Sequence, residues 1–209
     1  MDLEFIKTAF LTLFVAVDPP GLATLFLSLT AHLSLAQRKS VAVRAVVIAW
    51  CILTASALGG KDFLEMLGVS IPAFRIAGGL LLFSIAAEMV FERREARRSN
   101  SAEVVVNEHK SLAAFPLAMP LMAGPGAITA TILQASHAQG SIMNIIALMG
   151  VVTAVIGCCF ISFRLANHID KILGVSGRMI LARLLGVLLA AIAVQTVGDG
   201  VFAFIASKQ

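Results

Sequence analysis

Proline and glycine interrupt two long apolar segments of this chain near their centres. The first interruption is Asp18-Pro19-Pro20-Gly21 and the second is Gly124-Pro125-Gly126. Proline has no backbone N–H and clashes with the preceding helical turn, so a helix cannot continue through it undisturbed. Inside a bilayer such breaks are tolerated where the irregular backbone is buried in protein or lines a cavity. The sequence therefore predicts two interrupted membrane helices.

The composition indicates a polytopic, all-α membrane protein. Of 209 residues, 59% are apolar and only 13% are charged, whereas soluble domains carry about 25% charged residues. A helix needs about 20 apolar residues to cross a bilayer. The start of the chain lacks the basic region of a cleavable signal peptide, so we expect the first segment to remain in the mature protein. Six segments are predicted to span: 5–33, 41–60, 71–91, 112–136, 142–163 and 179–206.

Basic residues predict the orientation of these spans. Twelve of the sixteen lysines and arginines fall in the first, third and fifth loops. Cytoplasmic loops carry such an excess, so these loops are predicted to be cytoplasmic and both termini to lie outside. The twelve are Arg38, Lys39, Arg44, Arg93, Arg94, Arg97, Arg98, Lys110, Arg164, Lys171, Arg178 and Arg183.

The two halves of the chain resemble each other. An offset of roughly 105 residues brings Pro20-Gly21 onto Pro125-Gly126 and Thr24 onto Thr129. Each half holds three predicted spans, an odd number, so the halves would enter the membrane in opposite directions. This pattern predicts an inverted repeat of the kind found in many secondary transporters. The predicted units are a first repeat at 1–92, a cytoplasmic linker at 93–110 and a second repeat at 111–209.

The two breaks differ in charge. Asp18 is suited to cap a new helix whose first residue is Pro19. Capping alone is one interpretation, but ionisable groups within a membrane are functional candidates by default. The second break has no acid, so the N–H groups near Gly126 and Ala127 would be open to an anion.

We therefore predict a binding site formed by both breaks. Asp18 would interact with an ammonium group, a proton or a cation, and the start of the second half-helix with a carboxylate. The hydroxyls of Thr24 and Thr129 would either contact the solute or donate to a helical carbonyl. The predicted substrate-binding residues are Asp18, Pro19, Pro20, Gly21, Thr24, Gly124, Pro125, Gly126, Ala127 and Thr129.

Other polar and small residues have simpler interpretations. Gln195, Thr196 and Asp199 are candidates to line a path, although Asp199 is close enough to a span end to be solvated. Gly78-Gly79 and Gly186 favour close helix packing. His137 falls near a surface with no clustered ligands, so no metal site is predicted.

Several motifs resemble the MarC family of six-helix membrane proteins. They are Asp18-Pro19-Pro20-Gly21, Arg75-Ile76-Ala77-Gly78-Gly79, and 118–129, which reads AMPLMAGPGAIT. The first break of that family usually reads Asn-Pro-Ile-Gly-Asn, so Asp18 adds a charge here. The resemblance implies a transporter-like fold in the bacterial inner membrane and, by analogy with archaeal members, glycine or alanine as substrates.

Three functions compete. The first is a secondary transporter of small neutral amino acids, coupled to a proton or sodium ion or working by exchange. The second is a membrane-embedded enzyme on lipid-linked substrates, although no catalytic cluster is found and we expect no enzymatic activity. The third is an ion channel or non-transporting subunit. No phosphate-binding loop is present. We expect a coupling ion and no other cofactor. The expected partners are a small-molecule substrate and membrane lipids, and no nucleic acid. The sequence leaves open whether the protein forms a homo-oligomer.

Overall fold

The computed structural model describes residues 3–91, 113–138 and 141–207. Within these ranges the chain is helical and contains no strand, which confirms the all-α class. The predicted linker at 93–110 lies outside the described residues. The helices are α1 Leu3–Val17, α2 Pro19–Leu29, α3 Leu35–Met66, α4 Ile71–Val90, the π-helix η1 Ala113–Met122, α6 Pro125–His137, α7 Ile142–Arg164 and α8 Ala166–Ala206.

Five helical segments in the described ranges are long and apolar enough to cross a membrane. They are Leu3–Leu29, which combines α1 and α2, Leu35–Met66, Ile71–Val90, Ile142–Arg164 and Ser176–Ala206. The predicted span 112–136 is not among them, because it is divided into a ten-residue η1 and a thirteen-residue α6. The multi-pass character is therefore supported, and the sixth crossing stays a prediction.

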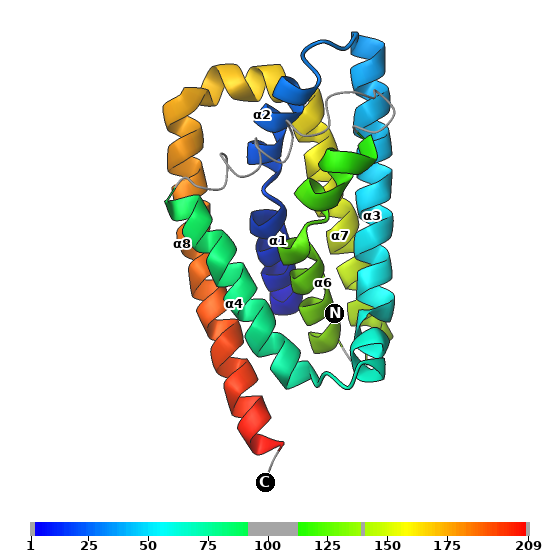
Figure 1. The fold of residues 1–209 in the computed structure, drawn as a ribbon, viewed down its shortest axis with the longest axis vertical. Helices are drawn as coiled ribbons and strands as arrows, with labels where there is room; N and C mark the ends of the chain where they lie inside the picture. Colours follow the sequence, from blue (N-terminus) through cyan, green and yellow to red (C-terminus); the bar gives the residue numbers. More distant parts are fainter. Residues whose placement is uncertain (1–2, 92–112, 139–140, 208–209) are drawn as a thin grey trace.

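The interrupted helices lie at the centre of the molecule. Figure 1 shows α1, α2 and α6 in the middle, with α3 and α7 on one flank and α4 and α8 on the other. In Leu3–Leu29, 61% of the most apolar stretch is buried, against 17–33% in the other four segments. The flanking helices instead expose large apolar side chains such as Leu80, Val187 and Phe202, which suits contact with lipid.

Glycines bring α4 and α8 close together. A Cβ on Gly79 would lie 2.9 Å from the Ala193 carbonyl oxygen, and one on Gly186 would lie 3.0 Å from the Ala86 carbonyl oxygen. Small residues allow membrane helices to approach in this way because packing drives their association. The predicted packing role of Gly79 and Gly186 is confirmed.

Two helices extend beyond the predicted spans. Helix α3 begins at Leu35 rather than at 41, because Ser34 and Gln37 form a reciprocal capping box at its start. Helix α8 begins at Ala166 rather than at 179 and bends at Gly174, which has a φ of 57°. Hydropathy identified the apolar part of each helix and missed its polar end.

Candidate functional site

A single residue, Asp18, separates α1 from α2. Its N–H donates to the Phe14 carbonyl oxygen at 2.8 Å, and its own carbonyl oxygen accepts the Leu22 N–H at 3.0 Å. Its φ of 61° and ψ of 66° place it in the left-handed region, which aspartate tolerates better than most residues. The backbone of Asp18 thus ends one helix and starts the next.

The Asp18 carboxylate caps α2. Oδ1 accepts the Gly21 N–H at 3.2 Å, and Pro19 and Pro20 occupy the first two helical positions, as the sequence predicts. Asp18 is buried, with 6% of its surface exposed. A Cβ on Gly21 would collide with the Asp18 carboxylate in its capping position, so the cap favours glycine there. The Thr24 hydroxyl donates to the Gly21 carbonyl oxygen at 2.9 Å, which is the helical alternative for that residue.

The second break has no such cap. The Ala123 N–H donates to the Ala118 carbonyl oxygen at 2.8 Å, five residues earlier, as in a π-helix. Gly124 is extended and makes no side-chain capping hydrogen bond, and α6 starts at Pro125. The start of α6 therefore carries the partial positive charge of an uncapped helix N-terminus.

Neighbouring side chains pack closely around the start of α6. A Cβ on Gly126 would collide with Ile85 of α4, and Ala127 is 2% exposed. Thr129 is buried, and a Cβ on Gly78 would lie 2.5 Å from its methyl carbon. Helix α1 contacts α6, and α2 contacts η1, so the two breaks lie in adjacent helices (Figure 1). The break residues line neither of the two cavities described next.

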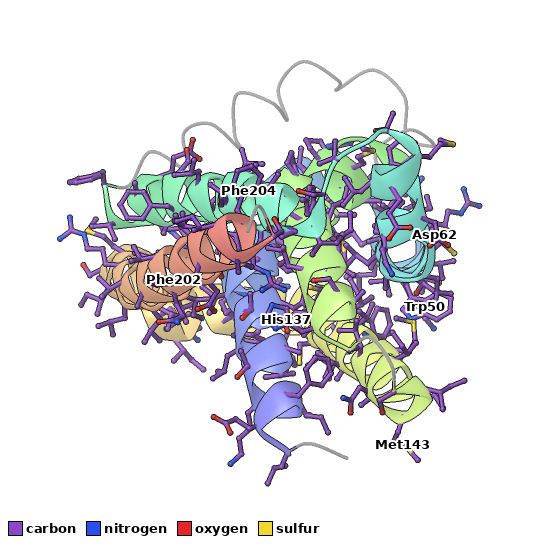
Figure 2. The ribbon with its side chains drawn as sticks, turned by 90° about the horizontal axis from the view of Figure 1, so that it is seen from below. Trp50, Asp62, His137, Met143, Phe202 and Phe204 are labelled. Carbon is purple, nitrogen blue, oxygen red and sulfur yellow. The ribbon has the colours of Figure 1, made fainter. Side chains whose placement is uncertain are left out.

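A cavity of about 530 Å³ lies between α1, α6 and α8, with contributions from α4 and α7. We call it the polar cavity. It is at the end of the molecule seen in Figure 2, where His137 is labelled. Its polar lining consists of Glu4, Thr8, Thr12, Gln134, His137, Asn144, Gln195, Thr196 and Asp199.

One buried hydroxyl at the lining of this cavity has no hydrogen-bond partner among the described residues. Thr12 is 2% exposed, and its Oγ1 makes no hydrogen bond. Other helical threonines nearby differ, since Thr131 donates to the Ala127 carbonyl oxygen at 2.7 Å and Thr196 to that of Ile192 at 2.8 Å. A buried polar group without a partner is unfavourable and calls for an explanation.

His137, the last residue of α6, lies beyond the predicted span 112–136. Displacement of water by the surrounding protein lowers the pKa of His137, and the positive charge of Arg75 lowers it further. The negative charge of Asp199 opposes both effects. The Asp199 carboxylate also accepts a hydrogen bond from Gln195 Nε2 at 2.9 Å.

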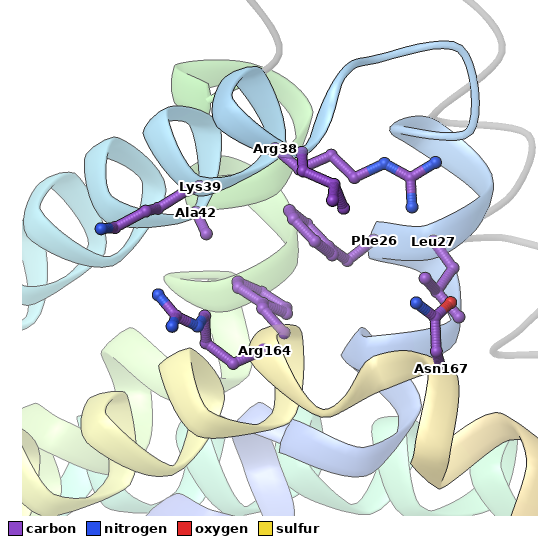
Figure 3. Close-up of a pocket in the computed structure, with 9 residues that line it drawn as sticks. Phe26, Leu27, Arg38, Lys39, Ala42, Arg164 and Asn167 are labelled. Atoms are coloured by element: carbon purple, nitrogen blue, oxygen red, sulfur yellow. The ribbon is translucent and has the colours of Figure 1, made fainter.

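A second cavity of about 310 Å³ lies near the other end of α7. Phe26 and Phe163 line it and stack with ring centroids 4.5 Å apart. Figure 3 shows Arg38, Lys39 and Arg164 around it, and none of the lining residues in the described part of the chain carries a carboxylate. We call it the basic pocket. Arg38 is held by hydrogen bonds from its guanidinium to the Leu33 and Ala31 carbonyl oxygens.

Sequence reasoning found part of the polar cavity and missed the rest. Gln195, Thr196 and Asp199 were candidates for a path, whereas Thr12, Gln134 and Asn144 were not considered. The available signal was spacing: Glu4, Thr8 and Thr12 recur every four residues and so share one face of α1. In the described ranges no group of three or more His, Cys, Asp or Glu side chains is arranged to hold a metal ion.

Comparison with known proteins identifies one family of membrane proteins. The family described as MarC family integral membrane protein matches residues 3–205. A UPF0056 membrane protein of Archaeoglobus fulgidus is 39% identical, covering 95% of this chain and 92% of the relative. YhcE of Escherichia coli, also named a UPF0056 membrane protein, is 33% identical over 92% of this chain and 89% of its own length. YvbG of Bacillus subtilis, named in the same way, is 32% identical over 96% of this chain and 95% of its own length. No solved structure matches the chain.

Proposed function

Because the chain belongs to the MarC family of integral membrane proteins, we propose that it is a secondary transporter of small neutral amino acids such as glycine or alanine. Transport is coupled to a proton or a sodium ion, or proceeds by exchange. The proposal rests chiefly on one observation: two adjacent, interior helices are interrupted, and only one of the two new helix starts is capped by an acid.

This asymmetry suits a zwitterion. An uncapped helix N-terminus attracts a carboxylate through its free N–H groups and partial positive charge. A buried carboxylate such as Asp18 attracts an ammonium group or a coupling cation. The ten predicted site residues at the breaks are therefore retained as the proposed substrate site. Gly126 and Ala127 are buried in this conformation, so solute entry requires the packing around α6 to open.

The two cavities support alternating access. Thr12 is six residues before Asp18 and Ala130 is four residues after Gly126, so the polar cavity ends roughly 6–9 Å along the helices from the breaks. At the opposite end of α7 the stacked rings of Phe26 and Phe163 line the basic pocket. In this proposal, the observed conformation is open to solutes from the polar cavity and closed at the Phe26–Phe163 pair.

The remaining topological features belong to the same proposal. The units at 1–92 and 111–209 are inverted repeats of three spans, with the first and fourth spans broken at mid-membrane and 93–110 as a cytoplasmic linker. The protein resides in the inner membrane with both termini outside, so the basic pocket is cytoplasmic. The basic side chains of that pocket, Arg38, Lys39 and Arg164, favour this orientation.

Transport into liposomes tests the proposal. Purified protein is assayed with labelled glycine and alanine under imposed proton and sodium gradients, and flux above that of empty liposomes is expected. If no amino acid is transported under any of these gradients, the proposal is contradicted and the enzyme and channel alternatives are favoured.

Two substitutions test the site. Asp18→Asn removes the charge but keeps a side chain able to cap, and Gly126→Leu adds bulk where even a Cβ collides with Ile85. We expect both to reduce flux at least tenfold. The control is Gly150→Leu, because nothing lies within 4 Å of a Cβ on Gly150. Wild-type flux in both test variants would remove the breaks from the substrate site.

A further inference from the structure

The polar cavity combines features of a ligand site that the breaks do not provide. Its volume of about 530 Å³ falls in the range of small-molecule pockets. It has an apolar side formed by residues such as Leu82 and Ile192, and several convergent polar groups. One of its lining residues, Thr12, is buried, with 2% of its surface exposed.

The Thr12 hydroxyl is the most specific of these features. It makes no hydrogen bond with the part of the chain that the structure describes, although the Thr196 hydroxyl in the same cavity donates to a helical carbonyl at 2.8 Å. A hydroxyl both donates and accepts, so Thr12 can make either kind of hydrogen bond with a ligand. Its Oγ1 is shielded from solvent in this conformation, so a solute reaches it only when the lining of the cavity shifts. A solute in the cavity would satisfy a group that is otherwise unpaired.

The charges of the cavity select the ligand class. Its described lining residues include the carboxylates of Glu4 and Asp199 and no lysine or arginine, although the positive charge of Arg75 acts on His137 in this lining. Gln195 donates a hydrogen bond to Asp199 at 2.9 Å and so orients that carboxylate. The two carboxylates outnumber Arg75, so the balance of charge at this partly enclosed surface favours cations over anions.

We propose that the polar cavity is a binding site for small solutes that carry an ammonium group, with Asp199 supplying the negative charge and Thr12 a hydrogen bond. The assignment rests on the proposed function in that the solute is a substrate on its way to the breaks. It adds a second site, distinct in its residues from the ten at the breaks.

Equilibrium binding to the full-length protein in detergent tests the assignment without requiring flux. Labelled glycine is bound to the purified protein and displaced with methylamine, which has only the ammonium group, or with acetate, which has only the carboxylate. We expect methylamine to compete and acetate not to compete at equal concentration. No glycine binding, or equal competition by acetate, would overturn the assignment.

Pairs of test and control variants show whether glycine binds in the polar cavity. Asp199→Asn and Thr12→Val are each expected to weaken glycine binding about fivefold or more, the loss of one hydrogen bond or charge contact. Asp62→Asn removes an exposed acid of α3 outside the cavity, and Thr54→Val removes another buried hydroxyl without a partner, also outside it. Both controls should bind like the wild type. Equal affinities in Thr12→Val and Thr54→Val would overturn the role of Thr12.

Thr12→Ser is the control for misfolding, because it keeps the hydroxyl and should keep most of the affinity for glycine. The outcomes also separate the two proposals. Binding with the expected variant pattern but without flux would contradict the transporter and leave this site standing. Flux that neither Asp199→Asn nor Thr12→Val alters, with unchanged binding, would remove this site and leave the transporter standing.

Discussion

At the scale of single residues, Asp18 explains how a buried helix can be interrupted while the N-terminus of the following helix, α2, stays capped. Its N–H completes α1, its carbonyl oxygen opens α2, and its carboxylate accepts the Gly21 N–H at 3.2 Å. Backbone strain at a φ of 61° accompanies these bonds. The residue therefore has a structural role that is separable from any role of its charge.

Substitution of Asp18 separates these roles. Asp18→Ala is expected to lower the free energy of unfolding by about 1–2 kcal/mol, because the cap is lost, with about 1 kcal/mol more because alanine disfavours the left-handed region. Asp18→Asn should stay within about 0.5 kcal/mol of the wild type, since asparagine caps equally well and tolerates that region. Thermal unfolding in detergent measures both. Equal destabilisation by the two variants would show that the charge, not the cap, stabilises the break.

His137 predicts a dependence of stability on pH. Its pKa in the folded protein lies below the ordinary value of about 6.5, because the surrounding protein displaces water and Arg75 adds positive charge. As the pH falls below 6.5, the unfolded chain binds this proton first, so the folded state loses stability. His137→Gln is expected to show a smaller fall in unfolding temperature between pH 7.5 and 5.5. An unchanged fall would assign the effect to other groups.

Some residue roles followed from the sequence and others depended on tertiary structure. The cap at Asp18 and the helix start at Pro19 follow from local chemistry, so both were predicted. Whether a threonine donates to its own helix or points into a cavity depends on neighbouring helices. Thr24 makes the local bond and Thr12 does not, although both lie on apolar helices. The sequence therefore left Thr24 open and did not single out Thr12.

At the scale of helices, hydropathy predicted where apolar helices lie but not how they end or bend. The segment 112–136 was expected to contain two α-helical halves, and its first half is the π-helix η1. Two prolines, Pro116 and Pro120, lie in η1 and cannot donate, which disfavours a regular α-helical ladder. The polar extensions of α3 and α8 were missed because they carry no apolar signal.

The contact between α4 and α8 can be tested with two glycines. Gly79→Ala places a Cβ 2.9 Å from the Ala193 carbonyl oxygen and 3.0 Å from the Val197 nitrogen, both backbone atoms that cannot move aside independently. We expect a loss of about 1–3 kcal/mol, typical of overpacking. Gly157→Ala in α7 meets nothing within 4 Å and should be neutral or stabilising by up to about 1 kcal/mol. Unfolding temperatures in detergent compare them, and equal values would contradict the close α4–α8 contact.

At the scale of the whole molecule, the two ends differ in chemistry. Among the described residues, the lining of the polar cavity has two carboxylates and no lysine or arginine, and that of the basic pocket has three cationic side chains and no carboxylate. Asn144 and Arg164 belong to different cavities and lie near opposite ends of α7, so the cavities are separated along the direction of the helices. Under the proposed function, the breaks lie between them, and the aromatic pair determines access from the basic end.

Removal of the aromatic pair tests that arrangement. In a protein without its native cysteines, Leu22→Cys places a thiol where the native side chain is 0% exposed, one helical turn from Phe26 towards Asp18. A water-soluble, membrane-impermeant thiol reagent should label it poorly while Phe26 and Phe163 stack. Adding Phe26→Ala should raise the labelling rate at least tenfold, from the basic side only. Phe10→Ala is the matched control, because it removes a ring stacked on Phe14 at 5.6 Å in α1. Faster labelling in both variants would indicate general loosening, and unchanged labelling in Phe26→Ala would mean that other groups close this end.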